Sequence, residues 1–187
     1  MLDSFLQKLL YLNKFQMANG KIELFGSRYI MLDANNLLGL QKIDKTKIYK
    51  NAKTSAEEDV KEVLEHAKVY HLLKESMHEC TKEVHGHLSN NNEGIVNTLR
   101  IMFNLYGLGN LKIIHLNNED KTAILRIVDS TIGLAQLKKA KTKTCECVLT
   151  SGILAGIFSY IFCKNIECIE KKCIARGDKY CEFVIRQ

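Results

Sequence analysis

The chain has 187 residues, of which 46% are hydrophobic and 26% charged, and its formal net charge is +6. This composition predicts one domain, residues 1–187, that buries its own core without disulfide cross-links. The longest apolar run is shorter than the roughly 20 residues that cross a bilayer, and the N-terminus lacks a signal-peptide pattern. We therefore expect a cytoplasmic protein with reduced thiols and no membrane span. The lysines are not interleaved with aromatic residues, so we expect no nucleic-acid partner.

Residues 1–35 are predicted to form a helix and a hairpin. Apolar side chains recur at helical spacing over residues 3–16, and two short strands, 21–25 and 28–32, flank a turn at Gly26-Ser27. A terminal amphipathic helix either packs against a second subunit or covers the sheet of its own chain, so this region is a candidate dimerisation element. A short helix through Leu37, Leu38 and Leu40 follows it.

The clearest amphipathic pattern begins at two overlapping capping boxes, Thr54 with Glu57 and Ser55 with Glu58. Behind them, apolar residues recur every three or four positions and predict a helix of about 25 residues. Five histidines lie in or just beyond this helix, and their spacing does not suit metal ligands on one helix face. We interpret them as surface or loop residues: His66, His71, His78, His85 and His87.

The second half of the chain alternates between strand pairs and helices. An apolar stripe predicts a helix that ends at Gly107, and two strands, 111–116 and 122–128, follow it. Next come a helix over 132–139, a buried helix over 148–162 and a final hairpin with arms 166–175 and 180–185. In the buried helix, Gly152 and Gly156 provide a smooth face for a close neighbour. Antiparallel pairs separated by helices predict an α+β fold, with helices packed on an antiparallel sheet.

Six of the seven cysteines lie in the last quarter of the chain: Cys145, Cys147, Cys163, Cys168, Cys173 and Cys181, with Cys80 apart from them. Such a cluster indicates a metal site, a redox role or disulfides, or the thiols simply fill core positions. Cys173 and Cys181 are expected on facing arms of the final hairpin. Glu170 reaches the same side as Cys173 only if the strand is bulged between them. Spacing alone leaves a metal site and core packing equally open.

The C-terminal motif resembles the signature of the 4-vinyl reductase domain, a family that includes archaeal stand-alone proteins and the aromatic-sensing domains of bacterial transcription activators. The resemblance covers roughly residues 120–186 and rests on the glycines of the buried helix, Glu170-x2-Cys173, Gly177-Asp178 and Cys181-Glu182-Phe183. It implies an α+β homodimer similar to a vesicle-tethering-complex subunit. It also implies zinc held by Cys147, Glu170, Cys173 and Cys181.

With four protein ligands, no position stays open for water, so the zinc is expected to be structural. Lys171, Lys172 and Arg176 are expected to offset the negative charge of the site. Cys145 is an alternative ligand, Cys163 and Cys168 are expected to be buried thiols, and the role of Cys80 is open.

The resemblance further implies a pocket between helices and sheet that binds an apolar or aromatic small molecule. The candidate lining residues are Ile95, Leu99, Phe103, Tyr106, Ile157, Phe158 and Ile161. No P-loop or DNA-binding motif is found in the sequence, so we expect a separate signalling partner. We predict no catalytic residue. Two alternatives remain, a reductase or accessory protein of tetrapyrrole-like metabolism and a thiol/zinc redox switch.

Overall fold

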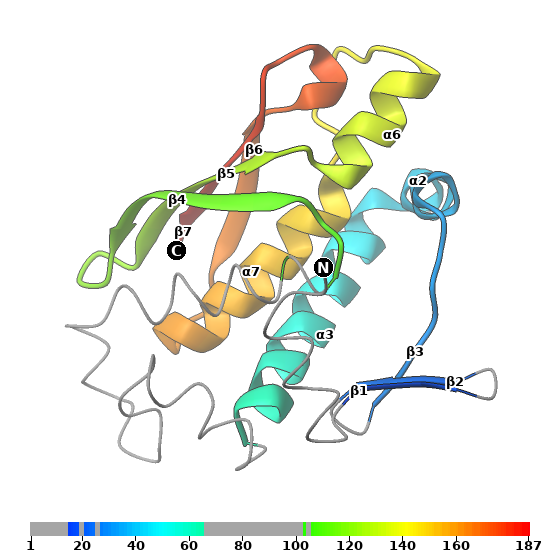
Figure 1. Ribbon diagram of the computed structural model, residues 1–187. Coiled ribbons are helices and arrows are strands. Elements are labelled where there is room, and N and C mark those ends of the chain that lie inside the picture. The colour runs from blue at the N-terminus through cyan, green and yellow to red at the C-terminus, as the bar shows by residue number, and fades with distance from the viewer. Residues whose placement is uncertain (1–14, 19–20, 25–26, 66–102, 104–105) are drawn as a thin grey trace. The chain divides into compact units, whose positions relative to one another are not determined.

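The computed structural model describes residues 15–18, 21–24, 27–65, 103 and 106–187 (Figure 1). The chain divides into two compact units, Met1–Asp33 and Ala34–Gln187. None of the described helices is both long and apolar enough to cross a membrane. The five histidines expected at the surface, from His66 to His87, and Cys80 lie outside the described residues.

The first unit contains a three-stranded antiparallel sheet of β1 (Phe15–Ala18), β2 (Lys21–Leu24) and β3 (Ser27–Tyr29). The helix predicted over 3–16 is wrong at its end, because Phe15 and Gln16 pair with β2 as a strand; residues 3–14 lie outside the described residues. The predicted hairpin is confirmed, but Leu24 pairs with Ser27. Ser27 therefore belongs to β3 rather than to the turn that the sequence predicted.

The second unit begins with two helices, α2 (Ala34–Ile43) and α3 (Lys45–Glu65). The short helix predicted at α2 is confirmed, but the predicted start of the next helix is wrong. Thr54 and Ser55, the predicted caps, lie inside α3. The helix instead begins after Asp44, whose Oδ1 accepts a hydrogen bond from the backbone N–H of Lys47 at 2.9 Å.

The main sheet is antiparallel, in the order β4-β5-β7-β6, with β4 Asn110–Asn117, β5 Thr122–Val128, β6 Glu167–Lys172 and β7 Cys181–Arg186. Alternate residues of β5 and β7 are buried, so each strand turns one face to the core. The predicted strands are confirmed except at one end. The arm expected to run to Ala175 stops at Lys172 and continues as a 3-10 helix, Ile174–Arg176.

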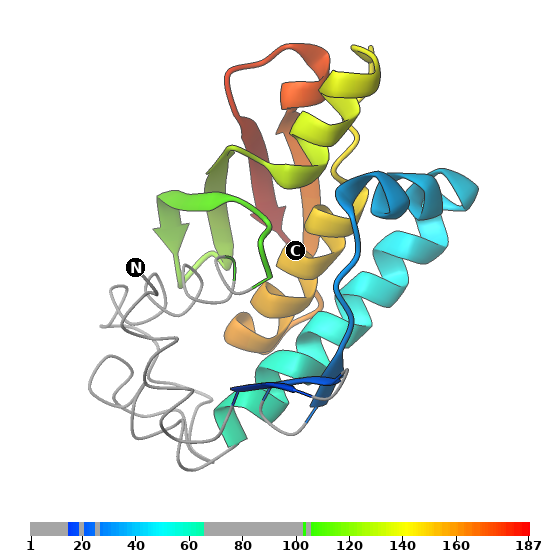
Figure 2. The same ribbon diagram turned by 45° about the vertical axis from the view of Figure 1, so that its right-hand side comes forward.

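Helix α7 (Val148–Phe162) is the central helix, as predicted: it packs on β6 and β7 and also along α3 (Figure 2). Its two glycines make the close approach possible. A Cβ added at Gly152 would lie 2.5 Å from the carbonyl oxygen of Tyr49, and one at Gly156 would overlap the carbonyl oxygen of Lys53. The backbones of α3 and α7 therefore meet without intervening side chains.

Two further predictions are confirmed in the described residues. Helix α6 (Thr131–Lys139) forms where expected, capped by Ser130. Gly107 has a φ of +62°, and the N–H of Leu108 bonds to the carbonyl of Phe103 at 3.1 Å, as in a glycine-terminated helix. The predicted α+β fold, with helices on an antiparallel sheet, is confirmed.

Candidate metal centre

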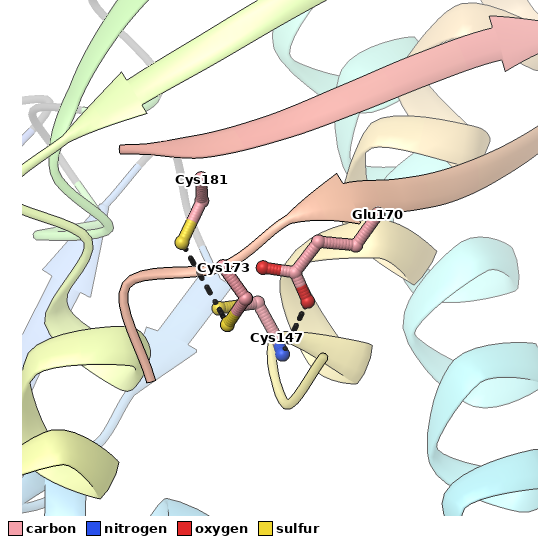
Figure 3. Close-up of side chains that lie close together, drawn as sticks. All are labelled: Cys147, Glu170, Cys173 and Cys181. Atoms are coloured by element: carbon pink, nitrogen blue, oxygen red, sulfur yellow. Dashed lines mark hydrogen bonds between the residues drawn. The ribbon is translucent and has the colours of Figure 1, made fainter. Parts of the chain in front are cut away.

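Three thiols and one carboxylate converge where α7 begins and the final hairpin closes. The ligand atoms of Cys147, Glu170, Cys173 and Cys181 all lie within 4.8 Å of one another. Figure 3 shows the three sulfur atoms gathered together, with the Glu170 carboxylate beside them. Cys147 caps α7, Glu170 lies on β6, Cys173 follows β6, and Cys181 opens β7.

A bulge in β6 brings Glu170 and Cys173 to the same site. Glu170 pairs with Phe183 but Lys172 pairs with the adjacent Glu182, so Lys171 is an extra residue in the strand. Without this bulge, residues three apart on a strand would point to opposite faces of the sheet. The predicted bulge between Glu170 and Cys173 is confirmed.

The turn between Cys173 and Cys181 is held by its own polar groups. The carboxylate of Asp178 accepts the N–H of Cys173 at 2.8 Å, and Cys181 Sγ accepts the N–H of Ile174 at 3.4 Å. Gly177 has a φ of +93°, which favours glycine at this turn. The sequence analysis used Gly177-Asp178 only as part of a motif; an Asp in a tight turn is a general signal for such backbone capping.

The start of α7 is capped by side chains from distant parts of the chain. Glu170 Oε2 accepts the N–H of Cys147 at 2.9 Å, and Gln41 Oε1 accepts the N–H of Leu149 at 2.8 Å. Glu170 therefore helps to fix Cys147 as well as contributing a carboxylate to the cluster. Gln41, on α2, was missed by the sequence analysis, because no local pattern connects it to a helix that starts more than a hundred residues later.

The geometry of the cluster fits a tetrahedral metal ion. Cys147 Sγ lies 3.8 Å from Cys173 Sγ and 3.6 Å from Cys181 Sγ. A tetrahedral ion with metal–sulfur bonds of about 2.3 Å would place its sulfur ligands about 3.8 Å apart. Glu170 Oε1 is buried and has no hydrogen-bond partner, which leaves a lone pair for a cation. The donor set and its spacing therefore suit an ion such as zinc.

The protein alone does not readily accommodate four ionised groups here. Hydrogen bonding with Cys173 and Cys181 raises the pKa of the Cys147 thiol far above its ordinary value, whereas bonds from Cys147 and Cys181 lower the pKa of Cys173 to about 2. Burial, together with the charge on Cys173, raises the pKa of Glu170 to about 8. A bound divalent cation would reverse this balance, because its own charge favours deprotonated ligands.

The remaining cysteines and the nearby cations differ in part from expectation. Cys168 is buried as predicted, but Cys163 is exposed at the C-terminal end of α7, where its backbone turns left-handed. Cys145 is half-buried, and Arg176 lies 3.7 Å from its sulfur. Lys172 is bound to Tyr180 and close to Glu182, so its charge is directed to the hairpin rather than to the metal ligands.

The residues predicted to line a ligand pocket lie mainly in the core where they are described. Phe103, Ile157 and Phe158 are buried. Tyr106 and Ile161 are half-buried, and the Tyr106 hydroxyl lies 3.5 Å from Asp59. Ile95 and Leu99 lie outside the described residues. The pocket itself stays a prediction.

Comparison with known proteins agrees with the fold and with the motif. The chain is similar to the phenol-responsive sensory domain of the transcription activator PoxR, solved with phenol, at 16% identity and a TM-score of 0.68, covering 98% of this chain and 90% of that one. A vinyl-4-reductase family protein from Methanocaldococcus jannaschii matches at 15% identity and a TM-score of 0.51, covering 100% of this chain and 96% of that one.

A trafficking protein particle complex subunit 3 from Naegleria fowleri gives 11% identity and a TM-score of 0.48, over 82% of this chain and 89% of that one. No curated protein matches the chain by sequence. The family model of the 4-vinyl reductase domain matches residues 127–187, which hold all four residues of the cluster. The predicted resemblance is thus confirmed, and residues 127–187 form a region of the 4-vinyl reductase domain family.

Proposed function

We propose that the protein is a sensory module that binds an apolar or aromatic small molecule and uses zinc as a structural brace. The observation that carries this proposal is the match to the 4-vinyl reductase domain, because the same residues contain the convergent Cys/Glu cluster. The similar PoxR domain is described as phenol-responsive, which supports sensing as the use of this fold.

The zinc would be held by Cys147, Glu170, Cys173 and Cys181. Four protein ligands complete a tetrahedral shell and leave no position for a reactive water, so the ion would supply cohesion rather than catalysis. It would tie the first residue before α7 to both arms of the final hairpin. The backbone N–H of Cys147 would stay bonded to Glu170 Oε2, leaving Glu170 Oε1 for the metal.

The ligand would bind in the apolar layer between α7 and the helix that ends at Gly107. Phe103, Ile157 and Phe158 are the described members of this lining, and their buried apolar surfaces suit an aromatic guest. Ile95, Leu99, Tyr106 and Ile161 complete the proposed set. The module would act as a homodimer in the cytoplasm and report to a separate partner protein; we propose no catalytic residue.

Metal analysis and ligand binding on one preparation test this proposal. Protein purified without chelator should contain one zinc per chain by elemental analysis, and native mass spectrometry should report the dimer. Phenol should raise the midpoint of thermal unfolding of this zinc-loaded protein, because a ligand that binds only the folded state stabilises it. Metal-free protein, or no stabilisation by phenol or related aromatics, would contradict the respective half of the proposal.

A further inference from the structure

A groove of about 660 Å³ lies between the first half of α3, the start of α7 and the segment that leads into β6. Three of its lining residues are lysines that lie on one side of α3: Lys45, Lys50 and Lys53. The metal ligands and the described residues of the proposed aromatic pocket are absent from its lining. The groove is therefore a separate feature of the fold.

The floor of the groove is held in place by hydrogen bonds. Lys53 donates to Asn165 Oδ1 at 2.6 Å and to Glu167 Oε1 at 2.7 Å, and its side chain is only 14% exposed. The Tyr49 hydroxyl donates to Glu167 Oε2 at 2.6 Å and accepts the N–H of Cys168 at 2.9 Å. These bonds use two of the three ammonium donors of Lys53 and leave the third for another partner.

The groove carries an excess of positive charge. Among the described residues that line it, Glu167 is the only acidic one, and it is paired with Lys53. Lys45 is paired with Glu146, which lies outside the lining, at 3.0 Å. Lys50 is exposed and has no ion-pair partner in the part of the chain that the structure describes. A bound anion would therefore meet one free ammonium group and one spare donor of a second.

The size of the groove and its lining define the rest of the ligand. A volume of this order suits a small organic molecule rather than an inorganic ion. The Tyr49 ring, Val148 and the aliphatic parts of the lysines offer apolar surface beside the charges. We propose that this groove binds a small organic anion, a phosphate ester or carboxylate that carries an apolar group, with Lys50 and Lys53 as its charge contacts.

The test uses the full zinc-loaded chain and phenyl phosphate as the probe. In two-dimensional amide NMR, phenyl phosphate should shift the signals of Tyr49, Lys50, Lys53 and Asn165 saturably. Inorganic phosphate should bind at least about tenfold more weakly, because it lacks the apolar group. Phenol alone should leave these signals in place, so failure of the aromatic pocket and failure of the groove are separate results.

A matched pair of charge reversals tests the contact residue. Lys50→Glu should weaken phenyl phosphate binding about tenfold, because it removes a charge-assisted hydrogen bond. Lys139→Glu, an equal change at an exposed residue of α6 outside the groove, should leave the affinity unchanged. The proposal is overturned if the signals do not saturate, if the two variants lose affinity equally, or if inorganic phosphate binds as tightly as phenyl phosphate.

Discussion

Replacement of Glu170 separates its two roles, as acceptor at the start of α7 and as metal ligand. Glutamine keeps a side-chain oxygen that can accept the Cys147 N–H, now at 2.9 Å from Glu170 Oε2, but it removes the carboxylate charge. Alanine removes both. The N–H of Cys147 belongs to a fully buried residue, so in Glu170→Ala it would be left without a partner.

The expected magnitudes follow from that difference. In metal-free protein, Glu170→Ala should lower the free energy of unfolding by about 1–3 kcal/mol relative to Glu170→Gln, the cost of a lost helix cap and a buried donor without a partner. Both variants should bind zinc at least about tenfold more weakly than the parent protein, since even residues that only orient metal ligands commonly contribute that much.

Urea unfolding in the presence of chelator measures the first effect, and competition with a zinc-binding dye measures the second. Equal stability of the Gln and Ala variants in chelator would refute the capping role. Unchanged zinc affinity in both variants would refute the assignment of Glu170 as a ligand, whatever the stability result.

Three further predictions concern other parts of the fold. Gly156→Ala should lower the free energy of unfolding by about 1–3 kcal/mol through overpacking against α3, whereas Gly39→Ala, where an added Cβ meets nothing within 4 Å, should raise it by up to about 1 kcal/mol; equal effects in urea unfolding would contradict the close approach. Although burial opposes it, hydrogen bonds from Lys53 and Tyr49 lower the pKa of Glu167, so its stabilising contribution should be present at neutral pH and lost as acid protonates it. Glu167→Gln should flatten that acid-dependent loss by less than about 1 kcal/mol, because the side chain is half-exposed; an unchanged acid unfolding curve would count against the pairing. Cys163→Ser should retain full zinc content by elemental analysis while Cys181→Ser loses it, and the reverse would refute the assigned ligand set.

The parts of this protein that the sequence predicted correctly depend on short-range patterns. The strands that form β4 and β5 show alternating residues around a polar turn, and α7 is apolar on nearly all sides. The bulge after Glu170 followed from parity along a single strand. The four members of the cluster were selected by a motif within one continuous segment, which the family match then confirmed as a region of the 4-vinyl reductase domain.

The errors arise where contacts between distant segments decide the structure. Helix α3 begins at Lys45 rather than at the capping boxes because its early turns also bury residues, among them Ala52, against α7. Local propensity at Thr54 is overridden by this tertiary packing. The bond from Tyr49 to Glu167 joins residues 118 positions apart, so no window of sequence could indicate the groove that they help to form.

The glycine contact between α3 and α7 has a mechanical consequence. Side chains between two helices can change rotamer and absorb a small displacement, but here the backbone of one helix rests directly on the other at Gly152 and Gly156. Ala52 and Ala56, the neighbours of these glycines on α3, also hinder sliding along the helix axes. A movement of α7 would therefore carry α3 with it as one rigid lever, and the outer surface of α3 is where a change at the zinc-braced end of α7 would become visible to another molecule.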